Sequence, residues 1–218
     1  MLGIGQKLRD ARLAQNLSLR DLAAKTEVTA SLLSQIENEK ANPSVRTLHS
    51  LADALGLPVD YFFPDRDEGD AENTRAVAAS ELTASELRQQ QINGVNSSPP
   101  IFTPPPEKAL SPILRAHERP TIHLQGDVTW ARLTPGKEAG KELMEICYAP
   151  GATSGERLSH HSGREFVMVL AGELTLELGF DQYKMAPGDS AIFDSETPHR
   201  LSNYGEEPMR AVSIIFAQ

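Results

Sequence analysis

The sequence predicts a two-domain α + β chain, in which an all-α domain is followed by an all-β domain, and two patterns predict it. Apolar residues recur at helical spacing from Ile4 to Phe63, as expected of a bundle of four or five short helices. From Ser111 onward, short runs rich in β-branched and aromatic residues alternate with glycine and proline turns. Such runs are typical of a barrel or sandwich of about 100 residues.

Local signals predict where the helices of the first domain begin and end. Ser18 is followed three residues later by Asp21, which resembles a capping box with aspartate in place of glutamate. Ser44 is placed to open another helix, and Gly56 is placed to close it. We expect this helical domain to span residues 1–64.

Residues 65–110 have a different composition and predict a linker. The segment begins with the acidic stretch DRDEGDAEN and ends near SSPPIFTPPPEK, which contains five prolines. Neither composition favours compact packing. Between them, residues 77–92 have the spacing of a short helix. The all-β domain is then expected to span residues 111–218.

Charge and hydropathy narrow the class of protein. The net charge is −9, but residues 1–64 carry seven basic and seven acidic residues, so the whole excess lies beyond them. A neutral domain can still present a basic face, and the acidic total therefore does not exclude nucleic acid. No apolar run approaches the roughly 20 residues of a membrane span, and no secretory leader is visible. We expect a soluble, cytoplasmic protein.

The stretch LSLRDLAAKTEVTASLLSQIENEKANPSVRTL, residues 17–48, resembles the helix-turn-helix of the Xre and phage-repressor family, and the resemblance covers roughly residues 4–63. It implies that the second helix of the pair, opened by Thr29, enters the major groove of DNA. Its apolar positions would pack inward, and its small or polar positions would face the bases. The alternative is a helical bundle whose polar face is merely solvated.

The resemblance also implies roles for individual residues. Gln35 is the best candidate for direct base reading through its amide, and Ala30 could meet a thymine methyl group. Arg12, Asn38 and Lys40 match positions that touch phosphates and would set the register. The full set of expected DNA-binding residues is Arg12, Thr29, Ala30, Ser31, Ser34, Gln35, Asn38 and Lys40.

The second domain resembles a cupin from about Ser111 to Gln218, which implies a double-stranded β-helix barrel. Glu165 is followed after six residues by Gly172, and the second cupin motif appears as Pro187-Gly188-Asp189 followed by His199 and, after three residues, Asn203. These spacings are those of the two cupin motifs.

One departure from the cupin pattern decides the expected metal ligands. Ser159 stands where the first histidine of the motif would be, with His160 and His161 after it. Neighbouring side chains of a regular strand face opposite ways, so both histidines cannot enter the barrel unless a bulge intervenes. The expected inward set is His161, Glu165 and His199. Two imidazoles and one carboxylate suit Fe(II), and zinc, manganese or nickel could also bind; the alternative is a polar cluster without metal.

The two resemblances together are those of bacterial transcription regulators, and no catalytic residue is assigned. They imply a homodimer that binds double-stranded operator DNA at an inverted repeat, with a small-molecule effector or a metal in the barrel tuning operator affinity. The alternative is a mononuclear non-haem Fe(II) cupin oxygenase similar to the hydroxypropylphosphonate epoxidases, with the helical domain used for oligomerisation. Fold and triad alone do not separate these functions.

Overall fold

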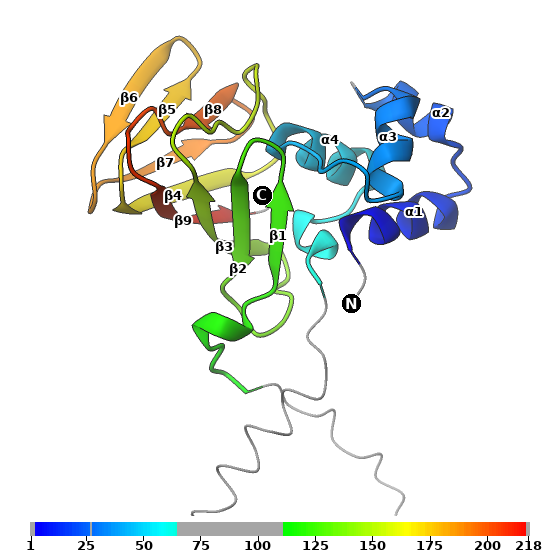
Figure 1. Ribbon diagram of the computed structural model, residues 1–218, viewed down its shortest axis with the longest axis horizontal. Coiled ribbons are helices and arrows are strands. Elements are labelled where there is room, and N and C mark those ends of the chain that lie inside the picture. Colours follow the sequence, from blue (N-terminus) through cyan, green and yellow to red (C-terminus); the bar gives the residue numbers. More distant parts are fainter. Residues whose placement is uncertain (1–2, 27, 65–110, 217–218) are drawn as a thin grey trace, which may run out of the picture. The chain divides into compact units, whose positions relative to one another are not determined.

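The computed structural model describes residues 3–26, 28–64 and 111–216. The linker and the short helix expected within residues 65–110 lie outside the described residues. The first domain contains helices and no strand among its described residues (Figure 1), which confirms the predicted all-α class. Its elements are α1 (Ile4–Ala14), α2 (Leu19–Lys25), α3 (Ala30–Glu37), α4 (Val45–Leu55) and the 3₁₀ helix η1 (Val59–Phe62).

The helix ends form as the sequence predicts. The Ser18 hydroxyl accepts a hydrogen bond from the backbone N–H of Asp21 at 3.1 Å, and the Asp21 carboxylate accepts one from the Ser18 N–H at 2.8 Å. The Thr29 and Ser44 hydroxyls each cap a helix by accepting a hydrogen bond from a backbone N–H, that of Leu32 in α3 and that of Thr47 in α4. Gly56 ends α4 with a φ of 63°, a left-handed conformation that glycine adopts without steric cost.

The second domain consists of two antiparallel sheets, which confirms the all-β class. Its larger sheet has the order β1-β2-β3-β9-β4-β7 and the smaller one the order β6-β5-β8, and the short 3₁₀ helix η2 (Ala116–Glu118) precedes them. The strands are β1 (Thr121–Leu124), β2 (Val128–Arg132), β3 (Lys141–Tyr148), β4 (Arg164–Ala171), β5 (Leu174–Leu178), β6 (Asp181–Met185), β7 (Ser190–Asp194), β8 (His199–Ser202) and β9 (Met209–Phe216). The sequence patterns did not single out β1, β6 and β8.

Strand register brings the two cupin motifs together. Glu165 on β4 pairs with Ile215 on β9 and with Phe193 on β7. Burial alternates along β4, so that Glu165 lies on the inward face. An isolated bridge joins Ser159 to His199, and this bridge holds the segment before β4 against β8. Residues about 40 positions apart in sequence therefore face one interior.

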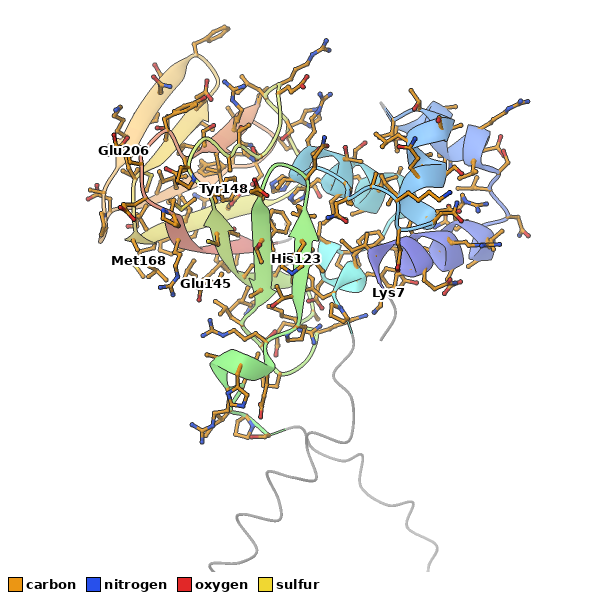
Figure 2. The ribbon with its side chains drawn as sticks, in the orientation of Figure 1. Lys7, His123, Glu145, Tyr148, Met168 and Glu206 are labelled. Atoms are coloured by element: carbon orange, nitrogen blue, oxygen red, sulfur yellow. The ribbon has the colours of Figure 1, made fainter. Side chains whose placement is uncertain are left out.

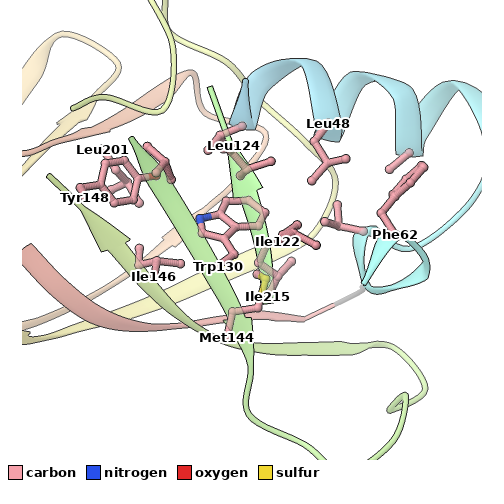
Figure 3. Packing of buried hydrophobic residues seen from close by; sticks show 14 of the residues in the cluster. Leu48, Phe62, Ile122, Leu124, Trp130, Met144, Ile146, Tyr148, Leu201 and Ile215 are labelled. Carbon is pink, nitrogen blue, oxygen red and sulfur yellow. The ribbon is translucent and has the colours of Figure 1, made fainter. Parts of the chain in front are cut away.

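The helices and the barrel belong to the same compact unit. One hydrophobic cluster includes Leu48 and Phe62 from the helices together with Ile122, Leu124 and Trp130 from the strands (Figure 3). Burial of such side chains, at roughly 25 cal/mol per Å² of apolar surface, stabilises the contact between helices and barrel. No helix in the described part of the chain is long and apolar enough to span a bilayer.

Candidate recognition helix and barrel site

The α3 helix has one buried face and one exposed face. Leu33 and Ile36 are almost completely buried, because they pack into the helical core. Thr29, Ser31 and Gln35 are exposed. The helix thus presents hydroxyl and amide groups to solvent at its start and along one side, the chemistry that reads base edges.

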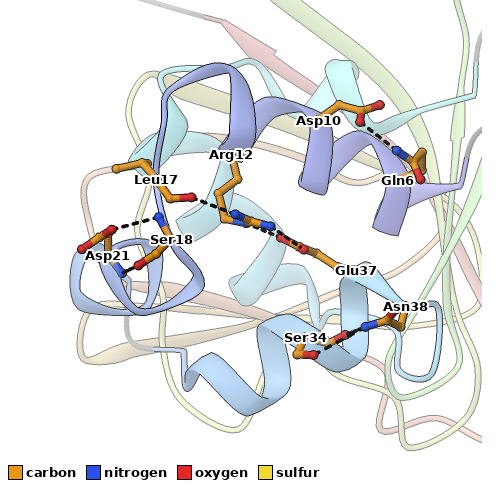
Figure 4. A network of polar contacts seen from close by, with 9 residues as sticks. All are labelled: Gln6, Asp10, Arg12, Leu17, Ser18, Asp21, Ser34, Glu37 and Asn38. Carbon is orange, nitrogen blue, oxygen red and sulfur yellow. Dashed lines mark hydrogen bonds and ion pairs between the residues drawn. The ribbon is translucent and has the colours of Figure 1, made fainter.

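Further expected contact residues surround this face. Ala30 and Ser34 are half-buried, whereas Asn38 and Lys40 are exposed. The Asn38 side-chain amide donates to the backbone oxygen of Ser34 at 2.7 Å (Figure 4). The Asn38 side chain therefore adds a second hydrogen bond to a carbonyl that its own backbone N–H also reaches at 3.2 Å, and its expected phosphate contact stays a prediction.

Arg12 has a different environment from the one expected of a phosphate ligand. Its guanidinium donates to both carboxylate oxygens of Glu37, at 2.6 and 2.9 Å, and to the backbone oxygen of Leu17 at 2.7 Å (Figure 4). The side chain is only 9% exposed. Two of its five N–H groups join α1 to α3 and a third holds Leu17 before α2, so we propose a structural role for Arg12 in place of the expected phosphate contact.

The three expected ligands lie together inside the barrel. Nε2 of His161 is 3.5 Å from Oε2 of Glu165, and Nε2 of His199 is 3.7 Å from the same oxygen. One ligand atom from each residue lies within 4.8 Å of the others. All three side chains are buried. His160 is exposed, so the neighbouring histidines do face opposite ways.

The triad is held in place by hydrogen bonds outside it. Nδ1 of His161 donates to the backbone oxygen of Ser162 at 3.2 Å, and Nδ1 of His199 donates to that of Thr197 at 2.9 Å. Ser213 on β9 donates to the other oxygen of Glu165 at 2.8 Å. Both imidazoles therefore direct Nε2 toward one point, an arrangement typical of histidines that bind metal.

Burial and mutual charge set the pKa values in this interior. Burial lowers the pKa of His161, but the adjacent Glu165 carboxylate outweighs this and the net pKa is raised. Burial raises the pKa of Glu165, yet the contacts with His161, His199 and Ser213 bring it below its ordinary value. The pKa of His199 is lowered, chiefly by burial. An ionised carboxylate in a buried site needs such partners.

Sequence reasoning missed several residues that surround the triad. His49 of α4 lies against His161, and burial followed by repulsion from His161 and His199 holds its pKa well below the ordinary value. Trp130 and Tyr148 line the same cavity. Figure 2 labels Tyr148 among the side chains of the strands. Burial raises the pKa of Tyr148, so its hydroxyl stays protonated. No local spacing in the sequence links these three residues to the cupin motifs.

The fold and the two sites define a helix-turn-helix protein with a cupin domain, and comparison with known proteins agrees. The Helix-turn-helix family matches residues 8–62 and the Cupin domain family matches residues 144–215. The transcriptional regulator ClgR of Mycobacterium tuberculosis strain H37Rv is 32% identical over 77 residues, which cover 35% of this chain and 69% of ClgR. The chain belongs to the helix-turn-helix transcriptional regulators and carries a C-terminal cupin domain.

Some known proteins match over nearly the whole chain. The HTH-type transcriptional regulator PuuR of Escherichia coli K12 is 26% identical over 214 residues, covering 97% of this chain and 94% of PuuR. The crystal structure of an HTH_3 family transcriptional regulator from Vibrio cholerae superposes with a TM-score of 0.60 at 19% identity, covering 99% of this chain and 95% of that one. The second likeness shows a shared fold alone.

Proposed function

We propose that this regulator binds operator DNA by placing α3 in the major groove. The observation that carries the proposal is the division of α3 into a buried face, with Leu33 and Ile36, and an exposed face, with Ser31 and Gln35. Such a helix can enter a groove about 12 Å wide while its other face stays anchored in the bundle. One such helix covers one half-site, and specific binding therefore calls for a homodimer on an inverted repeat.

The barrel is proposed to bind a small-molecule effector, a metal ion or both, and so to tune operator affinity. An effector that binds one arrangement of the dimer more tightly shifts the population toward that arrangement. A coupling of about 1 to 3 kcal/mol changes operator affinity roughly 5- to 150-fold. The buried triad at the centre of the barrel supports this role, because buried charges of this kind usually serve a site.

The spacing of the triad atoms favours an ion over a simple polar cluster. Separations of 3.5 and 3.7 Å between Nε2 and Oε2 exceed the roughly 2.7 to 3.2 Å of good N–H···O hydrogen bonds. Two ligands each about 2.1 Å from one metal are about 3.0 to 3.4 Å apart, which a small movement provides. His161, Glu165 and His199 would hold the metal, and Fe, Zn, Mn and Ni all suit this donor set. A metal bound there would offer open positions to an oxygen or nitrogen atom of an effector.

The same triad also supports the alternative, a non-haem iron oxygenase. The discriminating measurement is oxygen consumption by the iron-loaded protein with small acidic substrates. Sustained turnover would favour the enzyme. The names of the relatives, which are regulators, support regulation instead.

Selection of bound fragments from the source genome tests the regulator directly. The purified chain is mixed with sheared genomic DNA at low ionic strength, the bound fragments are sequenced, and the enriched sites are titrated by fluorescence anisotropy. We expect a short inverted repeat, bound by two chains. If no sequence is enriched and the chain binds all fragments with the same affinity, the proposal that it recognises an operator is refuted.

A further inference from the structure

His49 closes the barrel cavity from the side of the helical domain. The cavity has a volume of about 20 Å³, and Val45 and His49 of α4 contribute to its wall along with the barrel residues. The side chain of His49 is buried, with the residue only 7% exposed. The candidate effector site is therefore not made by the barrel alone.

The His49 ring lies flat on a residue of the triad. Its imidazole is stacked on that of His161, with ring centroids 4.2 Å apart and planes 7° apart. It also meets the Trp130 indole edge-on, with centroids 5.6 Å apart at 69°. The metal-ligating atoms of the triad do not include His49. The ring thus occupies space beside the triad as a flat, close-packed group.

The volume of the cavity and the polar atoms in its wall indicate what kind of ligand it can take. About 20 Å³ holds one water molecule or one ion, so an organic effector cannot enter until a part of the wall leaves. Trp130 Nε1 and the Tyr148 hydroxyl line this cavity and are buried. The indole N–H lies close to the Tyr148 hydroxyl, but neither group makes a hydrogen bond of regular geometry to any residue in the described part of the chain. Buried donors are normally paired, and these two could be satisfied by a ligand that carries an acceptor atom.

The helix that carries His49 is bonded to the barrel and packed into the helical core. The backbone N–H of Arg46 donates to the oxygen of Ser154 at 3.2 Å, and the N–H of Gln125 donates to the oxygen of Pro43, just before α4, at 2.9 Å. α4 also buries Leu48 in the hydrophobic cluster, which includes Ile122 and Leu124 of the barrel and Phe62 of the helical domain (Figure 3). Because close-packed interiors transmit strain, these contacts link α4 mechanically to the barrel wall beside His49.

We propose that His49 is a built-in occupant of the effector subsite. A small planar ligand with a hydrogen-bond acceptor takes the place of the imidazole on His161, accepts from Trp130 and Tyr148, and separates α4 from the barrel. Since α4 and α3 share one core, the displacement is carried to the recognition helix. This inference rests on the proposed function, for which it supplies the ligand class and the coupling step.

Trp130 is the only tryptophan of the chain, so its fluorescence reports directly on the His49 position. We would compare the full-length wild type with His49→Ala, which opens the subsite, and with His49→Phe, which keeps a flat ring. Imidazole is the probe. In His49→Ala we expect red-shifted emission and stronger acrylamide quenching, both reversed by saturable imidazole binding; His49→Phe and the wild type should show no such response at the same concentrations.

Operator affinity, measured on the same proteins, separates this inference from the proposed function. We expect His49→Ala to change operator affinity by at least about 5-fold and imidazole to restore it toward the wild-type value. Unchanged Trp130 emission and quenching in His49→Ala would overturn the subsite. Unchanged operator affinity would overturn the coupling while leaving DNA binding intact.

Absence of DNA binding by the wild type and unfolding of the His49→Ala variant can also be interpreted. A wild type that binds no DNA would refute the proposed function and the coupling, while the imidazole titration would still decide whether His49 occupies a subsite. Should circular dichroism show His49→Ala to be unfolded, His49→Gln removes the ring and keeps a polar side chain of similar length, and the same two results decide the inference.

Discussion

Arg12 and Glu37 form a bidentate ion pair that joins the first and third helices. Nε and Nη2 of the guanidinium donate to the two carboxylate oxygens at 2.6 and 2.9 Å. The two side chains are 9% and 6% exposed. Arg12 and Glu37 together therefore fix the angle at which α3 is presented, and a phosphate contact would require this pair to break.

Replacing Arg12 with alanine should mainly affect stability. Removing one partner leaves the part-buried charge of the other without its hydrogen bonds, and hydrogen bonds to charged groups contribute about 1.5 to 3 kcal/mol. We expect Arg12→Ala and Glu37→Ala to lower the free energy of unfolding by roughly 2 kcal/mol each, with a strong coupling in the double variant. Urea denaturation measures all three. Gln6→Ala, which removes the exposed hydrogen bond to Asp10, should change stability by less than about 0.5 kcal/mol.

A defined outcome would contradict the structural role of Arg12. If the guanidinium contacts phosphate, Arg12→Ala would weaken DNA binding strongly, flatten its salt dependence and leave the unfolding curve nearly unchanged. The two measurements on one variant therefore distinguish the roles.

Gln35 and Lys40 should differ in how they affect DNA binding. Both are exposed, but Gln35 lies on α3 and Lys40 lies just beyond it. Gln35→Ala should relax preference at one operator position by about 1 to 3 kcal/mol. Lys40→Ala should weaken binding to all sequences alike and reduce the slope of log affinity against log salt by about 1. Anisotropy titrations on an operator and its single-base variants, at several salt concentrations, measure both; identical effects of the two substitutions would contradict the assignment.

His161 and His160 offer a matched test of the metal site. His161 is buried within the triad and His160 is exposed, although the two are adjacent in the chain. After loading with Fe(II) or Zn(II) and dialysis, elemental analysis should find near-stoichiometric metal in the wild type and in His160→Ala. His161→Ala should retain little, because two protein ligands rarely hold a metal against dialysis. Full metal content in His161→Ala would mean that other groups bind it.

The sequence was sufficient to predict both fold classes and the composition of the triad, because these depend on local patterns. Helical spacing identified the bundle, and the Glu165–Gly172 and His199–Asn203 spacings matched the two motifs of the cupin resemblance, which strand pairing brings together in the fold. Strand β6 was not predicted, because four of its five residues are exposed and the segment therefore has no alternation of apolar and polar residues. β1 and β8 have only four residues each.

Tertiary partners account for what the sequence could not predict. His49 contacts a residue 112 positions later, His161, and within its own helix it stands beside buried Leu48 with nothing to mark it as part of a site. Arg12 likewise has the residue type and position of a phosphate ligand, and only the approach of Glu37 shows that its donors are occupied. In both cases the sequence supplied the chemistry and the fold supplied the partner.

Substitutions at Gly172 and Gly188 allow the destabilisation caused by steric contact to be distinguished from that caused by backbone strain. Their φ angles are +70° and +95°. A Cβ at Gly172 would lie 2.7 Å from the backbone oxygen of Pro208, whereas one at Gly188 would meet nothing within 4 Å. Gly188→Ala should cost about 1 to 3 kcal/mol through its dihedral angles, and Gly172→Ala a further 1 to 3 kcal/mol through overpacking. Equal melting temperatures for the two variants would show that the Pro208 segment moves freely.

Glu142 makes the stability of the contact between helices and barrel depend on pH. Its Oε1 accepts from the backbone N–H of Val59 at 2.7 Å, and the backbone N–H of Asp60 lies near the carboxylate, while Oε2 is buried and makes no hydrogen bond of regular geometry within the described residues. Burial, followed by repulsion from Asp60, raises the pKa of Glu142 from 4.5 to about 7, even though Arg132 is paired with Asp60 at 3.4 Å.

The sign of this dependence follows from the raised pKa. Between pH 4.5 and about 7 the folded chain binds more protons at Glu142 than the unfolded chain, so this group's contribution to stability falls as pH rises. Glu142→Gln keeps the acceptor for Val59 and imitates the protonated acid. We expect it to match the wild type in urea unfolding near pH 5 and to exceed it near pH 8. Glu173→Gln, which alters a half-exposed partner of Lys184, is the control, and its stability relative to the wild type should not change between these two pH values. If instead the wild type becomes more stable than Glu142→Gln as pH rises, the carboxylate of Glu142 is stabilised in its charged form.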